Sequence, residues 1–121
     1  QNKPDHDYLE YEEIEKNDDP CQVLKKVFES SVSAIKDTFK IINKLEFEKA
    51  LKVLLEAKRI MFCGVGDGAL VAMEAYQRFT RIGVHCFTHT DPDLQLIKTL
   101  QLEKDDVLIA ISYSGKSKTV V

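Results

Sequence analysis

The sequence predicts an α/β protein in which a parallel sheet lies between two layers of helices, in a flavodoxin-like arrangement preceded by a long helix. Three short apolar runs are typical of buried strands, and helical repeats of apolar residues separate them. Strands that alternate with helices through short links form parallel sheets by right-handed crossovers. Three strands are fewer than most open doubly wound sheets have, so we expect the domain to be incomplete in this chain.

The composition favours one small soluble, globular domain. The chain has 121 residues, of which 44% are hydrophobic and 31% charged. No run approaches the roughly 18 consecutive apolar residues of a membrane helix, and no signal peptide is visible at the N-terminus. The 3 cysteines form no CxxC pair, which argues against zinc and against a disulfide framework. We therefore expect a cytoplasmic protein that uses no metal or cofactor and contacts no membrane.

Charge is distributed unevenly along the chain. The net charge is −3, with −6 on residues 1–19 and +3 on residues 20–121. Nucleic-acid binding needs a clustered basic surface, which neither part offers. We therefore expect any contact with DNA to be made by a domain outside this chain.

The sequence pattern divides the chain into three parts. Residues 1–18 are polar and acidic, and two interpretations stay open for them: a solvated linker, or a segment that docks on a partner through a few apolar side chains. Residues 19–57 carry two helical patterns. Residues 58–121 alternate strand and helix patterns and break off where a further helix would begin, so the lack of an initiator Met and this ending suggest an excised piece of a longer protein.

Residues 19–57 are expected to form a long helix and a shorter one. Asp19 before Pro20, with Gln22 three positions after Asp19, is typical of a capped helix start. A break near residues 43–44 separates two apolar stripes. The first stripe comprises Leu24, Val27, Phe28, Val32, Ile35, Phe39 and Ile42. A helix of about 24 residues would span roughly 36 Å, so we expect it to pack on a second subunit or to separate two domains.

From Lys58 onward the pattern is strand, helix, strand, helix, strand. The expected strands are residues 59–63, 84–87 and 106–112. The expected helices are residues 69–82, ended by Gly83, and a helix that Asp91 and Pro92 begin, with Asp91 as its cap.

Two loops follow the first and third expected strands, at the sheet edge where open parallel sheets bind ligands. The first holds Gly64, Gly66 and Gly68, whose missing side chains let main-chain N–H groups approach an anion. It also fits the dinucleotide fingerprint G-x-G-x-x-G/A. Residues 87–88 stand where that site would need an acid, and Asp91 is better explained as a helix cap. Dinucleotide binding is therefore a lesser alternative.

The second loop, residues 112–117 with the sequence SYSGKS, has three hydroxyls and a glycine at a strand-to-helix junction. Hydroxyl and main-chain donors, with the field of a following helix, would hold a phosphate. A polar turn with a Ser cap is the alternative for such a loop by itself. The glycine loop on the neighbouring strand favours the phosphate site, and no Walker motif is present.

At these two loops the chain resembles the SIS (sugar isomerase) phosphosugar-binding domain. Residues 111–117, ISYSGKS, match the family's S-x-S-G-x-[ST] loop in full, whereas residues 64–66, GVG, match part of its G-x-G-x-S loop. Gly68 stands where the family commonly has Ser. The long helix, residues 45–60 and residues 68–73 are similar to the linker and the start of the SIS domain in RpiR/MurR-type transcriptional regulators. The resemblance covers residues 19–121, as the linker and the N-terminal half of the SIS domain.

The resemblance implies that the domain senses a sugar phosphate and controls a helix-turn-helix domain that precedes the linker. It implies a phosphate site made by Ser112, Ser114 and Ser117, with main-chain donors from Tyr113 and Gly115. It also implies a sugar side lined by Gly66, Asp67 and Gly68. Asp67 would bring a negative charge near the phosphate unless it meets sugar hydroxyls, and Lys116 and Lys118 either offset that charge or remain in solvent.

The alternative function is a sugar-phosphate aldose–ketose isomerase, which would need a general base and an acid near the sugar. His6, His85, His89 and Glu74 form no evident acid–base pair, so the sequence assigns no catalytic residue. In enzymatic SIS proteins the resemblance would place such groups largely in the missing C-terminal half. We favour the regulator, acting as a homodimer or a higher oligomer.

Overall fold

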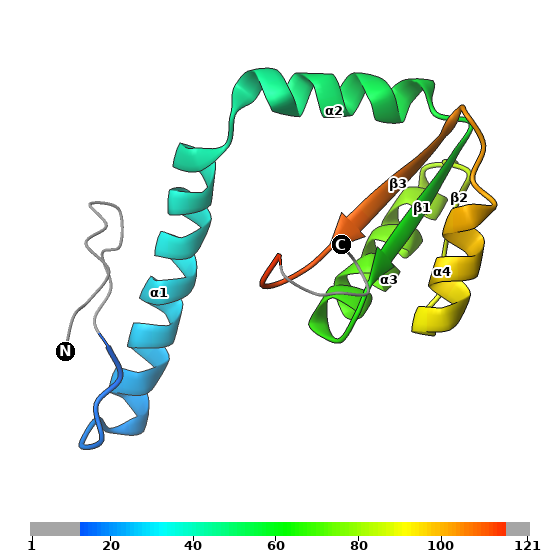
Figure 1. Ribbon diagram of the computed structural model, residues 1–121. Helices are drawn as coiled ribbons and strands as arrows, with labels where there is room; N and C mark the ends of the chain where they lie inside the picture. Colours follow the sequence, from blue (N-terminus) through cyan, green and yellow to red (C-terminus); the bar gives the residue numbers. More distant parts are fainter. Residues whose placement is uncertain (1–12, 116–121) are drawn as a thin grey trace. The chain divides into compact units, whose positions relative to one another are not determined.

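The computed structural model describes residues 13–115 and divides the chain into two compact units, residues 1–47 and 48–121 (Figure 1). The elements in chain order are α1 (Pro20–Ile41), α2 (Lys44–Glu56), β1 (Arg59–Gly64), α3 (Asp67–Arg81), β2 (Cys86–Thr88), α4 (Pro92–Leu100) and β3 (Asp106–Ile111). The predicted α/β class and the predicted order of elements are confirmed. No helix within residues 13–115 is long and apolar enough to cross a bilayer.

The N-terminal unit is built on α1, which begins at the predicted cap. The Asp19 carboxylate accepts the Gln22 N–H at 2.9 Å, and the Gln22 side chain accepts the Asp19 N–H at 2.8 Å, so the two residues satisfy each other's donors. Just before the helix, Lys26 bonds the Asp18 carboxylate at 2.7 Å and lowers the pKa of Asp18. The start of the long helix is therefore fixed by local side-chain chemistry.

The predicted break between the two N-terminal helices is also present. Ile42 leaves the helix with an extended backbone, ψ 126°. Asn43 then accepts the Glu46 N–H at 3.2 Å and so caps the start of α2.

The C-terminal unit contains a three-stranded parallel sheet in the order β2-β1-β3. β1 is the central strand, and its six residues pair with the six of β3 from Arg59↔Asp106 to Gly64↔Ile111. β2 is shorter and pairs only with Ile60, Met61 and Phe62. β1 and β3 are parallel neighbours, so their carboxyl ends lie side by side. The chain reverses its direction across the sheet between the β1–β2 and β2–β3 connections, which makes this pair of strand ends the switch point of the sheet.

Helices cover the two faces of this sheet because successive side chains of a strand point to opposite sides. Ile60 and Phe62 form the core with Ala72 of α3, and the Phe62 and Phe79 rings meet edge to face at 5.1 Å. Met61 faces α4, where the Thr99 hydroxyl lies 3.9 Å from its sulfur. The C-terminal unit is therefore a helix–sheet–helix sandwich with β1 at its centre.

One partly buried ion pair joins the amino ends of β1 and β3. The Arg59 guanidinium bonds both Asp106 carboxylate oxygens, with Nε at 3.1 Å from Oδ1, and the Asp106 side chain has no exposed surface. The guanidinium lowers the pKa of Asp106 from 3.8 to about 2 and also lies over the Phe87 ring at 5.7 Å. The two strands are thus held in register at the end opposite the predicted ligand site.

Two predicted details differ from the structure. The second strand begins at Cys86 rather than at residue 84, because the Val84 N–H returns to the Phe79 carbonyl at 3.1 Å to close the end of α3. Gly83 ends that helix as predicted, at φ 87°. Asp91 occupies the cap position of α4, but its side chain makes no capping hydrogen bond; only its carbonyl accepts the Gln95 N–H.

Candidate functional site

The two predicted ligand loops leave the same edge of the sheet. Gly64 and Ile111, the last residues of β1 and β3, are paired across the two parallel strands. The first loop therefore starts beside the second, and Figure 1 shows both arrowheads ending at the same side of the sheet. The juxtaposition that the sequence pattern predicted is present.

Two glycines let the first turn of α3 sit directly on the strand ends. A Cβ on Gly64 would lie 2.5 Å from the Gly68 carbonyl group, and a Cβ on Gly68 would lie 2.5 Å from the Ile111 carbonyl oxygen. Real Cβ atoms essentially never approach backbone this closely, so a side chain at either position would force the backbone to shift. Gly68 is buried, and its backbone is where the first loop touches the end of β3.

Gly66 has a different reason to be glycine. It is the N-cap residue of α3, and its φ of 61° lies in the region that L side chains rarely adopt. No side chain caps this helix, and Val65, Gly66 and Asp67 are exposed. The Gly68 and Ala69 N–H groups donate to the Val65 and Gly66 carbonyls at 3.1 and 3.0 Å, so what the exposed start of α3 offers an anion is mainly the positive end of the helix dipole.

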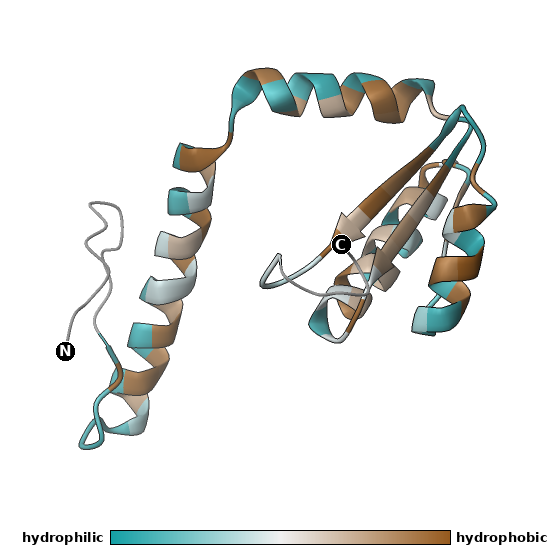
Figure 2. Ribbon diagram, viewed as in Figure 1, coloured by the Kyte–Doolittle hydropathy of each residue, from teal (hydrophilic) through white to brown (hydrophobic). Residues whose placement is uncertain are grey.

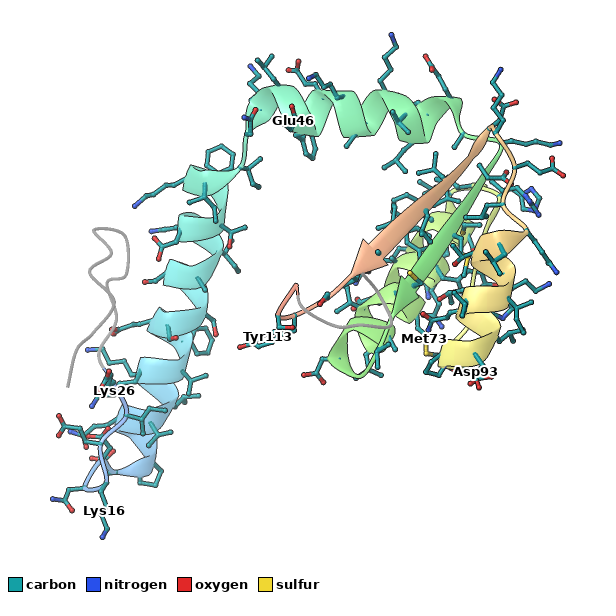
Figure 3. All side chains as sticks on the ribbon, viewed as in Figure 1. Lys16, Lys26, Glu46, Met73, Asp93 and Tyr113 are labelled. Atoms are coloured by element: carbon teal, nitrogen blue, oxygen red, sulfur yellow. The ribbon has the colours of Figure 1, made fainter. Side chains whose placement is uncertain are left out.

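The second loop is shaped by one of its own serines. The Ser112 hydroxyl oxygen accepts the Gly115 N–H at 2.9 Å, and Gly115 has a φ of 72°. Ser112 is half-buried, whereas Tyr113 is 96% exposed and projects from the tip of the loop (Figure 3). An oxygen that accepts this bond retains its O–H as a donor, so Ser112 holds the turn and still offers a proton to an anion.

The structure describes seven of the eight predicted site residues. Those on the first loop are Gly66, Asp67 and Gly68, and those on the second are Ser112, Tyr113, Ser114 and Gly115. Ser117 lies outside the described residues, as do Lys116 and Lys118. The role of each in ligand binding stays a prediction; the position of the described seven at one sheet edge is an observation.

A buried amide next to this site was not predicted from the sequence. Gln95 of α4 is 4% exposed, and its Nε2 donates to the Gly64 carbonyl at 2.8 Å. β2 ends before it reaches Gly64, so a side chain supplies the hydrogen bond that holds the end of β1. Gln95 and Thr99, four residues apart, put polar groups on the buried face of α4, and that pattern was the available signal.

A surface pocket also opens at the carboxyl end of β2. Its volume is about 380 Å³, and α3, α4 and the residues after β2 line it, among them Tyr76, His89 and Leu94. Neither predicted loop contributes to its lining.

The Cys63 thiol, next to Gly64, is 5% exposed, and burial raises its pKa, so it behaves as a packed apolar group. Within residues 13–115, no group of His, Cys, Asp and Glu side chains is placed to hold a metal ion.

Comparison with known proteins decides the family. The family model described as the SIS domain matches residues 53–121, which is more than half of the chain. The chain belongs to the SIS domain family. This confirms the SIS family, which the two loop motifs had predicted.

Relatives of the SIS chain include regulators. A protein described as an HTH-type transcriptional regulator from Caldanaerobacter subterraneus is 37% identical over 108 residues, which are 89% of this chain and 38% of the relative. Another with that description, from Thermotoga maritima, is 32% identical and matched over 40% of its length. The chain thus spans about two fifths of the length of these regulators.

A second kind of relative also contains this region. A protein described as bifunctional protein glk, from Burkholderia thailandensis, is 30% identical over 109 residues, which are 90% of this chain but 17% of the relative. The same SIS segment therefore occurs in proteins of different overall organisation.

Proposed function

We propose that this chain is the sugar-phosphate-binding part of a transcriptional regulator whose DNA-binding domain lies outside the chain. One observation carries the binding site: the glycine loop and the serine loop leave adjacent parallel strands, with Gly64 paired to Ile111. The family match and the HTH-type description of the relatives support the regulatory role. We place such a regulator, of the RpiR/MurR type, in the cytoplasm as a homodimer or a higher oligomer.

In this proposal the second loop binds the phosphate. Ser112, Ser114 and Ser117 donate hydroxyl hydrogen bonds to the phosphate oxygens, and the main chain at Tyr113 adds a further donor. The Gly115 N–H contributes by holding the turn through its hydrogen bond to the Ser112 hydroxyl oxygen. Donors that are fixed before binding lose little freedom when the anion arrives, and the Ser112–Gly115 hydrogen bond fixes this turn.

The first loop then holds the sugar. Its main chain at Gly68 lies against the end of β3, Gly66 is exposed just before the helix, and the exposed Asp67 stands at the first turn of α3. A carboxylate accepts hydrogen bonds from sugar hydroxyls but repels phosphate, so Asp67 favours a ligand that places its hydroxyls there and its phosphate at the serines.

Regulation requires that the ligand bind one conformation of the protein more tightly than another. We propose that a sugar phosphate bridging the two loops changes the packing of subunits, and that α1 passes this change to the DNA-binding domains. DNA binding by the complete regulator, measured with and without the sugar phosphate, tests this step.

The binding site is tested by calorimetric titration of the chain with a panel of pentose and hexose phosphates. Ser114→Ala should weaken binding of the best ligand by roughly 1–3 kcal/mol, because a charged acceptor loses a donor. Thr90→Ala is the matched control, since it removes an exposed hydroxyl at the carboxyl end of β2. Unchanged affinity in Ser114→Ala, or an equal loss in Thr90→Ala, would place the site elsewhere.

An isomerase is the second candidate function, because the chain belongs to the SIS (sugar isomerase) domain family. Incubation of the complete protein with the aldose phosphate that binds best, followed by NMR, separates the two functions. Formation of a ketose phosphate at an enzymatic rate would identify an enzyme, and tight binding without turnover supports the regulator.

A further inference from the structure

A second pocket of the C-terminal unit carries basic side chains. It lies beside the edge strand β2, has a volume of about 260 Å³, and its lining includes Arg59, His89 and Lys98. No residue of the glycine loop or the serine loop lines it. Figure 2 shows that β1 starts hydrophilic and continues apolar, and the hydrophilic start is Arg59. We call this cavity the basic pocket.

Three elements bring the lining of the basic pocket to one face of the sheet. Arg59 lies two residues before Met61, which faces α4, so both side chains point to the same side. Phe87 of β2 is paired with Met61 across the parallel strands and shares that side. α4 contributes Lys98 and, three residues later, its C-cap residue Gln101. The pocket is therefore built entirely within the C-terminal unit.

The guanidinium of Arg59 is fixed in place but keeps unused donors. Its Nε and one terminal nitrogen bond the two carboxylate oxygens of Asp106, and it lies 5.7 Å from the centre of the Phe87 ring. A guanidinium has five N–H groups, and this pairing uses two of them. The remaining three can bind another acceptor, and little freedom is lost on binding because the group is already held.

The other basic groups of the pocket lack an acidic partner in the described part of the chain. Lys98 is half-buried and makes no ion pair there. His89, whose ring centre lies 5.9 Å from that of Phe87, makes no hydrogen bond there, and an imidazole keeps at least one N–H donor. Among the described residues no acidic side chain lines the pocket, and the Asp106 carboxylate is fully buried against Arg59. The positive charge of Lys98 is therefore not balanced inside the pocket.

This set of donors fits a compact oxyanion. The planar guanidinium binds phosphate oxygens through paired hydrogen bonds, and an ammonium group adds a point charge. The Gln101 amide offers further N–H groups. Pockets for drug-sized ligands measure about 300–1,000 Å³, so this smaller one suits a compact group. Two positive charges that are partly shielded from water attract a dianion more strongly than a monoanion, which favours phosphate over a carboxylate.

The position of the pocket keeps it clear of the strands that would complete the sheet. In the described sheet β2 is an edge strand, in the order β2-β1-β3. The flavodoxin-like order 2-1-3-4-5 adds later strands beyond β3. Such strands would extend the opposite edge of the sheet and leave the β2 edge as it is.

We propose that the basic pocket binds the phosphate group of a small molecule, at a second site separate from the glycine and serine loops. Arg59 and Lys98 contact the phosphate oxygens, and His89 and Gln101 donate further hydrogen bonds. The proposal does not rest on the proposed function, because the two sites share no residue.

NMR titration of the ¹⁵N-labelled chain with inorganic phosphate at low salt tests the basic pocket. The main-chain amide signals of His89, Lys98 and Gln101 should shift with one common dissociation constant, and the affinity should fall as NaCl is added. The signals of Tyr113 and Ser114 report the proposed sugar-phosphate site separately, so failure at one site is distinguishable from failure at the other. Shifts confined to Tyr113 and Ser114, or no shifts at all, would overturn the second site.

Substitution of Lys98 tests its role in binding. Lys98→Gln should raise the dissociation constant for phosphate about tenfold, because the anion loses a charged donor, and Lys98→Arg should recover most of the affinity. Lys104→Gln is the matched control, since it removes the same charge from an exposed lysine outside the pocket. Far-UV circular dichroism verifies that the variants keep their helices.

Two results with these variants would contradict the proposal. Equal losses in Lys98→Gln and Lys104→Gln would show that phosphate responds only to the overall charge of the chain. An unchanged dissociation constant in Lys98→Gln would mean that Lys98 serves only the last turn of α4, where a basic side chain stabilises the helix end.

A comparison of three small molecules shows what the phosphate belongs to. Inorganic phosphate and ribose 5-phosphate should both shift the signals of the basic pocket, whereas unphosphorylated ribose should not. Tighter binding of the ester would identify a phosphate monoester as the ligand, and equal affinity would identify free phosphate. Shifts of the same signals by ribose alone would overturn the proposal, because the pocket would then recognise hydroxyl groups rather than charge.

Discussion

Gly68 belongs to the predicted ligand loop and also packs directly against the end of β3, so its substitution tests both the packing and the site. A Cβ there would lie 2.5 Å from the Ile111 carbonyl oxygen, where an ordinary contact is 3.4–4 Å. The first turn of α3 must therefore move away from β3 by about 0.9 Å, and both partners in the clash are backbone rather than a flexible side chain.

The expected magnitude follows from two opposing effects. Overpacking of this kind costs about 1–3 kcal/mol, whereas replacing a helical glycine by alanine gains about 0.5–1 kcal/mol. Because the clash is between backbone groups, the upper end of the overpacking cost applies, and Gly68→Ala should lower the free energy of unfolding by about 2 kcal/mol. Gly68→Ser should cost at least as much, although Ser is the common residue of the family's loop, and it should bring no gain in sugar-phosphate affinity.

Urea denaturation followed by far-UV circular dichroism measures the stability change. Asp67→Ala serves as the control, because Asp67 is exposed one position earlier and its loss removes only a dipole interaction of about 0.3–1 kcal/mol. A Gly68→Ala protein as stable as the wild type would refute the close approach of α3 to β3. A Gly68→Ser protein that is stable and binds more tightly would show that this position accepts a ligand-facing hydroxyl.

Two further predictions concern the groups that hold β1. Because Arg59 lowers the pKa of Asp106 to about 2, the charged carboxylate favours the folded state; the resulting stability is present above about pH 4 and is lost as the pH falls toward 2. Urea midpoints measured from pH 6 to pH 2 should show this loss. Asp106→Asn should be less stable than the wild type at pH 6 and should lose less stability on acidification. An equal loss of stability in the two proteins would contradict the role of the Asp106 carboxylate. Gln95→Leu should cost about 1–3 kcal/mol because the Gly64 carbonyl loses its donor. Gln101→Leu, at the exposed C-cap of the same helix, should be nearly neutral in the same denaturation assay.

Most of the secondary structure could be predicted from local sequence patterns. The capped start at Asp19, the break at residues 43–44 and the change from helical to strand patterns after Lys58 depend on neighbouring residues, and the structure confirms them. The end of the helix at Gly83 was also predictable. The hydrogen bond from the Val84 N–H to the Phe79 carbonyl was not, and because of it the second strand begins two residues later than predicted, at Cys86.

Contacts between distant residues lay beyond sequence patterns. The Arg59–Asp106 pair joins residues 47 positions apart and requires the strand register. Gly68 was predicted to line a sugar because its place in the loop motif suggested it, yet its burial against Ile111 depends on how closely a helix packs on a strand end. The seven described site residues were brought to one edge as predicted, because parallel strands fix where their carboxyl ends lie.

The end of β1 is supported unequally on its two sides. Toward β3, Gly64 is held by a backbone ladder that a substitution leaves in place, whereas toward α4 the support is a single amide group on Gln95. On the β3 side, therefore, only a change of fold would remove the support of Gly64. On the α4 side, a single substitution at position 95 would remove it. Divergence among descendants of this domain should begin at position 95 and spare the β3 side.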